Sequence, residues 1–195
     1  MNGIIPLLTY IFVVSFTPGP NNIMSMTNGM RYGYRSILRF IGGILCGFAV
    51  IALSAGMLNL FMANLIPASG KWLKILAAVY MFYLAFRILR SGPMDDNKEG
   101  SSTNRFWFGF TMQFINVKAI LFAISVFSLF VSDFSRDFFM VVLFALFLVF
   151  VTFMGTSLWA LGGTLFRSLA QKQYKIFNGI MGGLLIYTGI AGLLK

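Results

Sequence analysis

Residues 138–166 read FFMVVLFALFLVFVTFMGTSLWALGGTLF and contain no charged side chain. A helix needs about 20 mostly apolar residues to cross the hydrocarbon core of a bilayer, and this stretch is long enough. Asp, Glu, Lys and Arg are also absent from residues 1–30, 40–70 and 176–194. The pattern therefore predicts several membrane-spanning helices.

The composition of the whole chain points to the same class. Hydrophobic residues make up 58% of the 195 residues and charged residues only 10%, whereas a soluble domain carries roughly a quarter charged residues. Two weaker spans, residues 72–89 and 106–132, bring the expected number to six. The expected fold is an all-α integral membrane protein with six transmembrane helices surrounded by the lipid bilayer.

Basic residues gather in the links that follow the first, third and fifth spans. These links carry Arg31, Arg35, Arg39, Arg90, Lys98, Arg105, Arg167, Lys172 and Lys175. An excess of Lys and Arg marks the cytoplasmic side of a membrane protein. We therefore expect both termini outside the cytoplasm, and we interpret the net charge of +10 as a topology signal, with no nucleic-acid partner.

A polar link at residues 91–105 divides the chain close to its midpoint. We expect a three-helix repeat over residues 1–90, this link on the cytoplasmic side, and a second repeat over residues 106–195, all in one membrane domain. Because each half has an odd number of spans, the second half is inserted upside-down relative to the first. Inverted repeats of this kind are typical of transporters, which bind substrate where helices are interrupted.

The first span of the first half carries the sequence SFTPGPNN at residues 15–22. Pro18 and Pro20 lack amide hydrogens, so carbonyls one turn earlier lose their helical partners, and Gly19 adds backbone freedom. At membrane depth such groups are tolerated only where they face protein or a water-filled cavity. We expect these three residues to form a helix break with a gating role, the alternative being a kink that only shapes packing.

Asn21 and Asn22 directly follow this break. They are placed to cap a second half-helix, whose positive N-terminal end would face the cavity. Both are therefore candidate substrate-binding residues.

The first span of the second half contains the sequence QFINVK at residues 113–118. Lys118 lies roughly 18 Å from either end of the span, and burying its ammonium group costs about 2.5–3.5 kcal/mol on insertion scales. In a straight helix, Asn116 and Lys118 would point about 200° apart, so a local break is needed for both to face the interior. Both are candidate substrate-binding residues, the alternative being a lysine held by neighbouring carbonyls for structure alone.

Other polar and small residues fit a packed bundle around a cavity. Thr111, Lys118 and Ser125 follow a seven-residue spacing that places them on one face of a straight helix. The candidate cavity-lining residues are Thr17, Thr111, Gln113, Ser125, Thr152 and Thr156, although such hydroxyls often bond to their own helix. The pairs Gly43 and Gly47, and Gly179 and Gly183, have a spacing typical of close helix packing.

Several function classes are excluded by composition. The chain has no His, one Cys and five carboxylates, so it lacks a metal-ligand set, a disulfide framework and a nucleophile–base pair. We expect no enzyme activity, no metal and no cofactor. No carboxylate lies in any predicted span, which argues against a dibasic substrate and against a divalent cation.

The sequence TPGPNN at residues 17–22 resembles the signature of the lysine exporter (LysE/RhtB) family of small bacterial amino-acid exporters. The length, the six spans and the midpoint link are similar over the whole chain. Most of that family has Asn-Pro-Lys in the second half, where this chain has Asn116, Val117 and Lys118. That departure resembles the branch of cysteine and O-acetylserine exporters, as do the pairs Phe106–Trp107 and Gln113–Phe114 and the stretch that begins at Trp159.

The resemblance implies an exporter in the bacterial inner membrane for small neutral amino acids or derivatives such as cysteine and O-acetylserine, working by alternating access with proton coupling. On this hypothesis the substrate carboxylate meets Lys118 and the amide hydrogens at Asn21 and Asn22. Its ammonium group meets the Asn116 oxygen and the carbonyls freed near Val14 and Phe16.

Lys118 is the only titratable candidate for proton coupling inside the predicted spans. A passive channel for small neutral solutes, an exporter of homoserine- or threonine-type amino acids and a non-transporting scaffold stay as alternatives. The sequence leaves open the substrate, the coupling ion and the oligomeric state, including a homo-oligomer.

Overall fold

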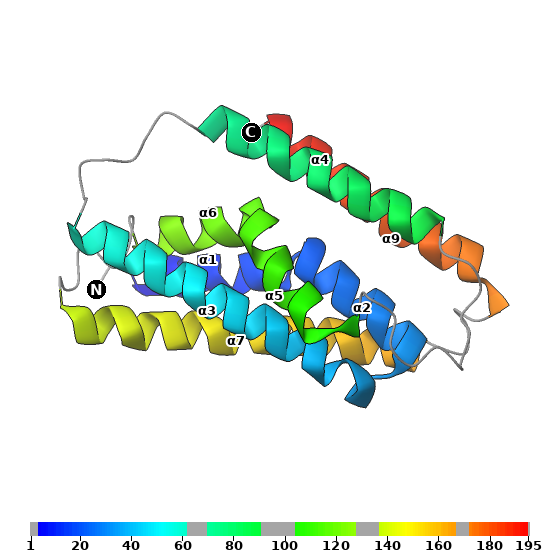
Figure 1. Ribbon diagram of the computed structural model, residues 1–195, viewed down its shortest axis with the longest axis horizontal. Helices are drawn as coiled ribbons and strands as arrows, with labels where there is room; N and C mark the ends of the chain where they lie inside the picture. The colour runs from blue at the N-terminus through cyan, green and yellow to red at the C-terminus, as the bar shows by residue number, and fades with distance from the viewer. Residues whose placement is uncertain (1–3, 62–69, 91–103, 128–136, 167–171, 195) are drawn as a thin grey trace.

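The computed structural model describes residues 4–61, 70–90, 104–127, 137–166 and 172–194, and every regular element within them is a helix (Figure 1). The helices are α1 (Ile4–Phe16), α2 (Pro20–Tyr32), η1 (Arg35–Ile37), α3 (Leu38–Phe61), α4 (Gly70–Leu89), α5 (Phe106–Ile115), α6 (Val117–Val126), α7 (Phe138–Leu165) and α9 (Tyr174–Leu194). The expected all-helical class is confirmed for these residues. Residues 91–103 of the expected polar link lie outside them.

Two stretches of the described chain are long and apolar enough to cross a membrane. They are Arg35–Leu60 and Phe138–Leu165, and the pair α5 and α6 makes a third if it is counted as one bent span. The outer face of α7 exposes large apolar side chains, with Phe139 66% and Leu146 60% exposed. These features are consistent with a membrane protein, while the division into six spans and two inverted repeats stays a prediction.

Both predicted helix interruptions are present. α1 ends at Phe16, and α2 begins at Pro20 after Gly19, whose backbone is extended. Proline is suited to this first helical position because its missing amide hydrogen would have no partner there. The axes of α5 and α6 differ by 65° at Asn116, so a sharp break forms without a proline at Val117.

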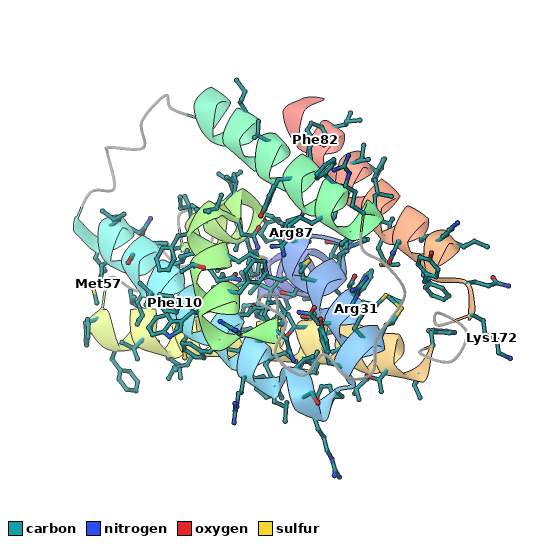
Figure 2. The ribbon with its side chains drawn as sticks, turned by 45° about the vertical axis from the view of Figure 1, so that its right-hand side comes forward. Arg31, Met57, Phe82, Arg87, Phe110 and Lys172 are labelled. Atoms are coloured by element: carbon teal, nitrogen blue, oxygen red, sulfur yellow. The ribbon has the colours of Figure 1, made fainter. Side chains whose placement is uncertain are left out.

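The broken helices pack on two long helices. α2 packs mainly on α7, and α5 on α3, while α3 and α7 also contact each other. α4 and α9 run side by side along one edge of the molecule (Figure 1). In Figure 2, Arg31 and Lys172 lie toward one end of the molecule and Met57 toward the other. Both broken helices are therefore held against the pair formed by α3 and α7.

Two apolar clusters lie in the described interior. One contains side chains from α1, α3, α6 and α7, with Ile11, Phe48 and Phe122 among its members. The other contains side chains from α2, α3, α4 and α9, with Ile23 and Leu185 among its members. The first cluster reaches the second break through Ala119 and Phe122 of α6, and the second cluster contains Ile23, which lies one turn after the first break.

Close helix packing relies on glycine at several positions. A Cβ at Gly43 would collide with the Phe106 carbonyl, and one at Gly47 would come within 2.6 Å of the Phe110 carbonyl. The predicted close approach of α3 through this pair is thus confirmed. The prediction for Gly179 and Gly183 is not met within the described residues, because a Cβ at either would meet none of their atoms within 4 Å. α9 instead contacts its neighbour at another glycine, since a Cβ at Gly182 would lie 2.7 Å from Cγ of Leu89 of α4.

Candidate functional site

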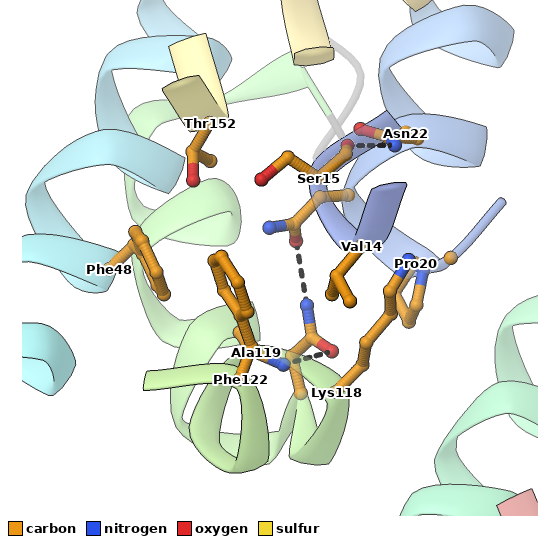
Figure 3. A pocket seen from close by; sticks show the side chains of 12 residues that line it. Val14, Ser15, Pro20, Asn22, Phe48, Lys118, Ala119, Phe122 and Thr152 are labelled. Carbon is orange, nitrogen blue, oxygen red and sulfur yellow. Dashed lines mark hydrogen bonds between the residues drawn. The ribbon is translucent and has the colours of Figure 1, made fainter. Parts of the chain in front are cut away.

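A cavity lies where the two helix breaks meet (Figure 3). Its empty space measures about 390 Å³, including the part that is open to the outside, and is lined by Val14, Ser15, Gly19, Pro20, Asn21, Asn22, Phe48, Asn116, Lys118, Ala119, Phe122 and Thr152. Only about 40 Å³ of this space can be reached by the centre of a water-sized sphere, and one water needs roughly 10–15 Å³ of such space. In this structure the cavity therefore has room for a few water molecules, and a larger ligand requires the walls to move apart.

The structure brings most of the predicted site residues to this wall. Those on it are Gly19, Pro20, Asn21, Asn22, Asn116, Lys118 and Thr152. Thr17 and Pro18 lie just behind it and contact the Lys118 side chain. Gln113 is fully buried next to the wall, where it bonds to Asn21.

Thr111, Ser125 and Thr156 do not line the cavity. Thr111 is exposed and donates to the carbonyl of Trp107 in its own helix at 2.7 Å. Thr156 likewise donates to the carbonyl of Thr152 at 2.8 Å. The shared face of Thr111, Lys118 and Ser125 holds only for a straight helix, and the 65° bend at Asn116 breaks it.

The Lys118 ammonium group binds the end of α1. Its Nζ donates to the Thr17 carbonyl and the Thr17 Oγ1, both at 3.0 Å, and to the Pro18 carbonyl at 3.2 Å. An ammonium group has three hydrogens, and three acceptors surround it. Because a helix carries partial negative charge at its C-terminal end, α1 also offsets the charge of the lysine.

Gly19 makes room for this lysine. A Cβ at position 19 would lie 2.9 Å from Cδ and 3.0 Å from Nζ of Lys118. Any larger residue would therefore press on the lysine stem, so glycine in the motif serves the contact between the two breaks.

The other carbonyls at the end of α1 also have donors. Asn22 Nδ2 donates to the carbonyls of Ser15 at 2.8 Å and Thr17 at 2.9 Å. Trp159 Nε1 of α7 donates to the Phe16 carbonyl at 3.0 Å, and Thr17 Oγ1 donates to the carbonyl of Val14 at 3.0 Å.

The Val14 and Phe16 carbonyls, which are predicted to meet a substrate ammonium group, therefore each already accept a side-chain hydrogen bond in this structure. Their contact with a substrate stays a prediction. Helix-end carbonyls need partners wherever water is excluded, and side chains supply them here.

Asn116 holds the second break and joins it to the first. Its Oδ1 accepts from the Ala119 amide at 3.3 Å and so caps α6, while its Nδ2 donates to Asn21 Oδ1 at 2.9 Å. Gln113 Nε2 donates to the same oxygen at 3.0 Å, and Asn21 Nδ2 donates to Gln113 Oε1 at 2.9 Å. We call Asn21, Gln113 and Asn116 the amide cluster.

The charge of the cavity wall is positive. Lys118 contributes a full charge, and α2 and α6 both begin at the wall, so their N-terminal ends contribute partial positive charge. None of the residues that line the wall has a carboxylate. Such a wall favours an anionic group, as helix N-termini commonly do.

Sequence reasoning missed the two phenylalanines of the wall and one of its hydroxyl residues, Ser15. The Phe48 and Phe122 rings stack with centroids 6.0 Å apart and planes 9° apart. In the sequence these two phenylalanines cannot be distinguished from the phenylalanines that face lipid, so no pattern indicates that they line the cavity. Ser15 was detectable, because it is a polar residue in the last turn of an apolar helix, next to the Pro-Gly-Pro break.

Comparisons with known proteins bear on this site. The family model described as LysE type translocator matches residues 12–195. Proteins named cysteine/O-acetylserine efflux protein match over 182 residues, which is 93% of this chain and 93% of each relative. The identity is 31% for Escherichia coli O139:H28 (strain E24377A / ETEC), and 30% for Escherichia coli (strain K12) and for Shigella sonnei (strain Ss046). No solved structure matches the chain.

Proposed function

Because the chain belongs to the LysE type translocator family, we propose that it exports small neutral amino acids or derivatives such as cysteine and O-acetylserine. The observation that carries this proposal is the small cavity between two broken helices, which has a cationic wall without carboxylates. A zwitterion with an uncharged side chain matches such a wall. A second cationic group on the substrate would find no counter-charge there.

The substrate carboxylate binds near Lys118 and the N-terminal ends of α2 and α6, formed by Asn21, Asn22 and Asn116. In the structure Nζ of Lys118 donates to oxygens of Thr17 and Pro18. A carboxylate that binds Lys118 therefore competes with the end of α1. Binding would loosen the contact between the two breaks, which gives the substrate a direct effect on helix position.

The proposed setting is the bacterial inner membrane, with six spans as two inverted three-helix repeats and both termini outside. The basic ends of the helices support this orientation, because Arg31 and Lys172 lie toward the same end of the molecule (Figure 2). Transport then proceeds by alternating access around the cavity, with the cytoplasmic and outer halves of the broken helices opening in turn.

The proposal includes proton coupling, for which Lys118 is the titratable group at the cavity. A passive channel is the second candidate function, because the cavity is partly open in this structure. Only a coupled exporter moves its substrate against a gradient.

The test is efflux from liposomes that contain the purified protein and are loaded with labelled O-acetylserine or cysteine, with and without an imposed pH gradient. We expect efflux that depends on the gradient and is lost in Lys118→Ala. Lys175→Ala, which changes an exposed lysine of α9, is the matched control and should transport normally. Efflux that ignores the gradient would identify a channel, and normal efflux by Lys118→Ala would contradict the site.

A further inference from the structure

The Ser15 hydroxyl is a buried group without a hydrogen-bond partner in the described part of the structure. A hydroxyl in an apolar helix usually donates to a carbonyl one turn earlier, as Thr156 does to the carbonyl of Thr152. The Ser15 hydroxyl makes no bond of this kind, yet it lies on the cavity wall. Leaving a buried hydroxyl unpaired costs free energy, so such a group in a native protein requires an explanation.

The backbone of Ser15 is held in place from two sides. Its carbonyl accepts from Asn22 Nδ2 at 2.8 Å. On the other side, α7 approaches so closely that a Cβ at Gly155 would lie 2.7 Å from the same carbonyl oxygen. The hydroxyl therefore projects from a fixed point at the junction of α1, α2 and α7.

Thr152 adds a second hydroxyl at the same place. It is 8% exposed and lies three residues before Gly155 on α7, so both residues face the end of α1. In Figure 3 the Ser15 and Thr152 side chains lie across the upper part of the cavity from each other, and Lys118 lies on the lower side. The cavity thus has a hydroxyl end and a cationic end.

We propose that Ser15 and Thr152 form a subsite for the side chain of the transported amino acid. The subsite hydrogen-bonds a short polar group, such as the ester carbonyl of an O-acylated serine or a thiol. This inference rests on the proposed function, because a carboxylate bound at the cationic end directs the substrate side chain to the opposite end. The Phe48 and Phe122 rings between the two ends contact its methylene group.

The alternative occupant of the subsite is the α-ammonium group, and the two occupants predict different selectivity. Every amino acid has an ammonium group, so losing its partner would weaken transport of all substrates equally. A partner for the side chain matters only to substrates with a polar side-chain group. The ratio of transport rates for two matched substrates therefore separates the two cases.

The experiment measures efflux of O-acetylserine and of norvaline from liposomes that contain the full chain. Norvaline has an unbranched apolar side chain and lacks the ester. We expect wild type to prefer O-acetylserine and Ser15→Ala to lower that preference by on the order of tenfold, the worth of one neutral hydrogen bond. Norvaline efflux should not fall. Ser54→Ala, an exposed serine of α3, is the matched control.

Thr152 provides an independent pair of variants in case Ser15→Ala does not fold. Thr152→Val removes the hydroxyl at nearly constant volume and should also lower the preference, whereas Thr152→Ser keeps the hydroxyl and should retain it. An unchanged ratio in Ser15→Ala and Thr152→Val, or an equal fall for both substrates, would overturn the subsite while leaving the exporter intact. Efflux of neither compound by wild type would overturn the proposed function and the subsite with it.

Discussion

Between α1 and α2 the helix is interrupted by two prolines and a glycine, whereas between α5 and α6 it is interrupted at Asn116 alone. The proline break leaves helix-end carbonyls that the local chain cannot all satisfy, so Lys118 and Trp159 donate to them from other helices. The asparagine break caps its own following helix. The difference shows that a break made by removing donors depends on distant residues, while a break made by a capping side chain is nearly self-sufficient.

Among the side chains that hold the two breaks, the largest effect should come from Lys118→Met. The change removes three hydrogen bonds to the end of α1, and hydrogen bonds to charged groups are worth about 1.5–3 kcal/mol each in soluble proteins. Because the bonds share one group, we expect a loss of about 2–3 kcal/mol in the free energy of unfolding. Denaturant titration in detergent micelles measures it. Lys175→Met should change nothing, and an equally stable Lys118→Met protein would show that the proline break does not need this donor.

Asn116→Ala should have the next largest effect. Loss of the cap on α6 costs about 1 kcal/mol, and loss of the bond to Asn21 adds about 0.6 kcal/mol, the average for such bonds in membranes. The same titration measures the sum. Asn116→Ser retains a capping hydroxyl and should recover the larger part. If both variants lose the same stability, the cap does not maintain the second break.

Trp159→Phe tests the distant donor to the proline break. The ring is largely kept, but the Phe16 carbonyl loses its partner, which should cost about 1 kcal/mol. Trp107→Phe is the matched control, because Trp107 is 68% exposed. The melting temperatures of the two variants, measured by thermal unfolding, show the difference in stability. Equal melting temperatures for the two would argue that the Phe16 carbonyl finds another donor.

Val117→Pro should have the smallest effect. Val117 is the first residue of α6, where proline is favoured, and Asn116 before it has φ −80° and ψ 85°, outside the helical region that a following proline disfavours. We expect a change within about 0.5 kcal/mol. Ile120→Pro would remove the amide that bonds to the Asn116 carbonyl and should cost about 3 kcal/mol or more. Similar losses for both would mean that α6 does not begin at Val117.

The positions of the breaks could be predicted from the sequence because their causes are local. Pro18 and Pro20 remove backbone hydrogen-bond donors in any surrounding. A lysine at position 118, in the middle of an apolar span, requires polar partners. The amide cluster was predictable only in part. Asn21 and Asn116 are correctly predicted to line the cavity, whereas Gln113 lies behind the wall, where its side chain bonds to Asn21.

What could not be predicted depends on contacts between distant helices. The donor to the Phe16 carbonyl lies 143 residues away, at Trp159. The prediction that Thr111 lines the cavity depends on a helix face that exists only in a straight helix. Gly179 and Gly182 lie in the same helix and are equally small, and only the position of Leu89 on α4 determines which of them is needed.

The glycine contacts have a mechanical consequence. Gly29 and Gly163 bring the backbones of α2 and α7 together, as Gly43 and Gly109 do for α3 and α5. Because glycine lets the backbones approach this closely, α2 lies directly on α7 and α5 lies directly on α3, so each pair joins half of a broken helix to a long helix. The amide cluster joins the two helix pairs, because Asn21 belongs to α2 and Gln113 belongs to α5. A substrate that moves the two pairs apart has to break these side-chain hydrogen bonds and part of the packing between α3 and α7, while the glycine contacts within each pair are kept.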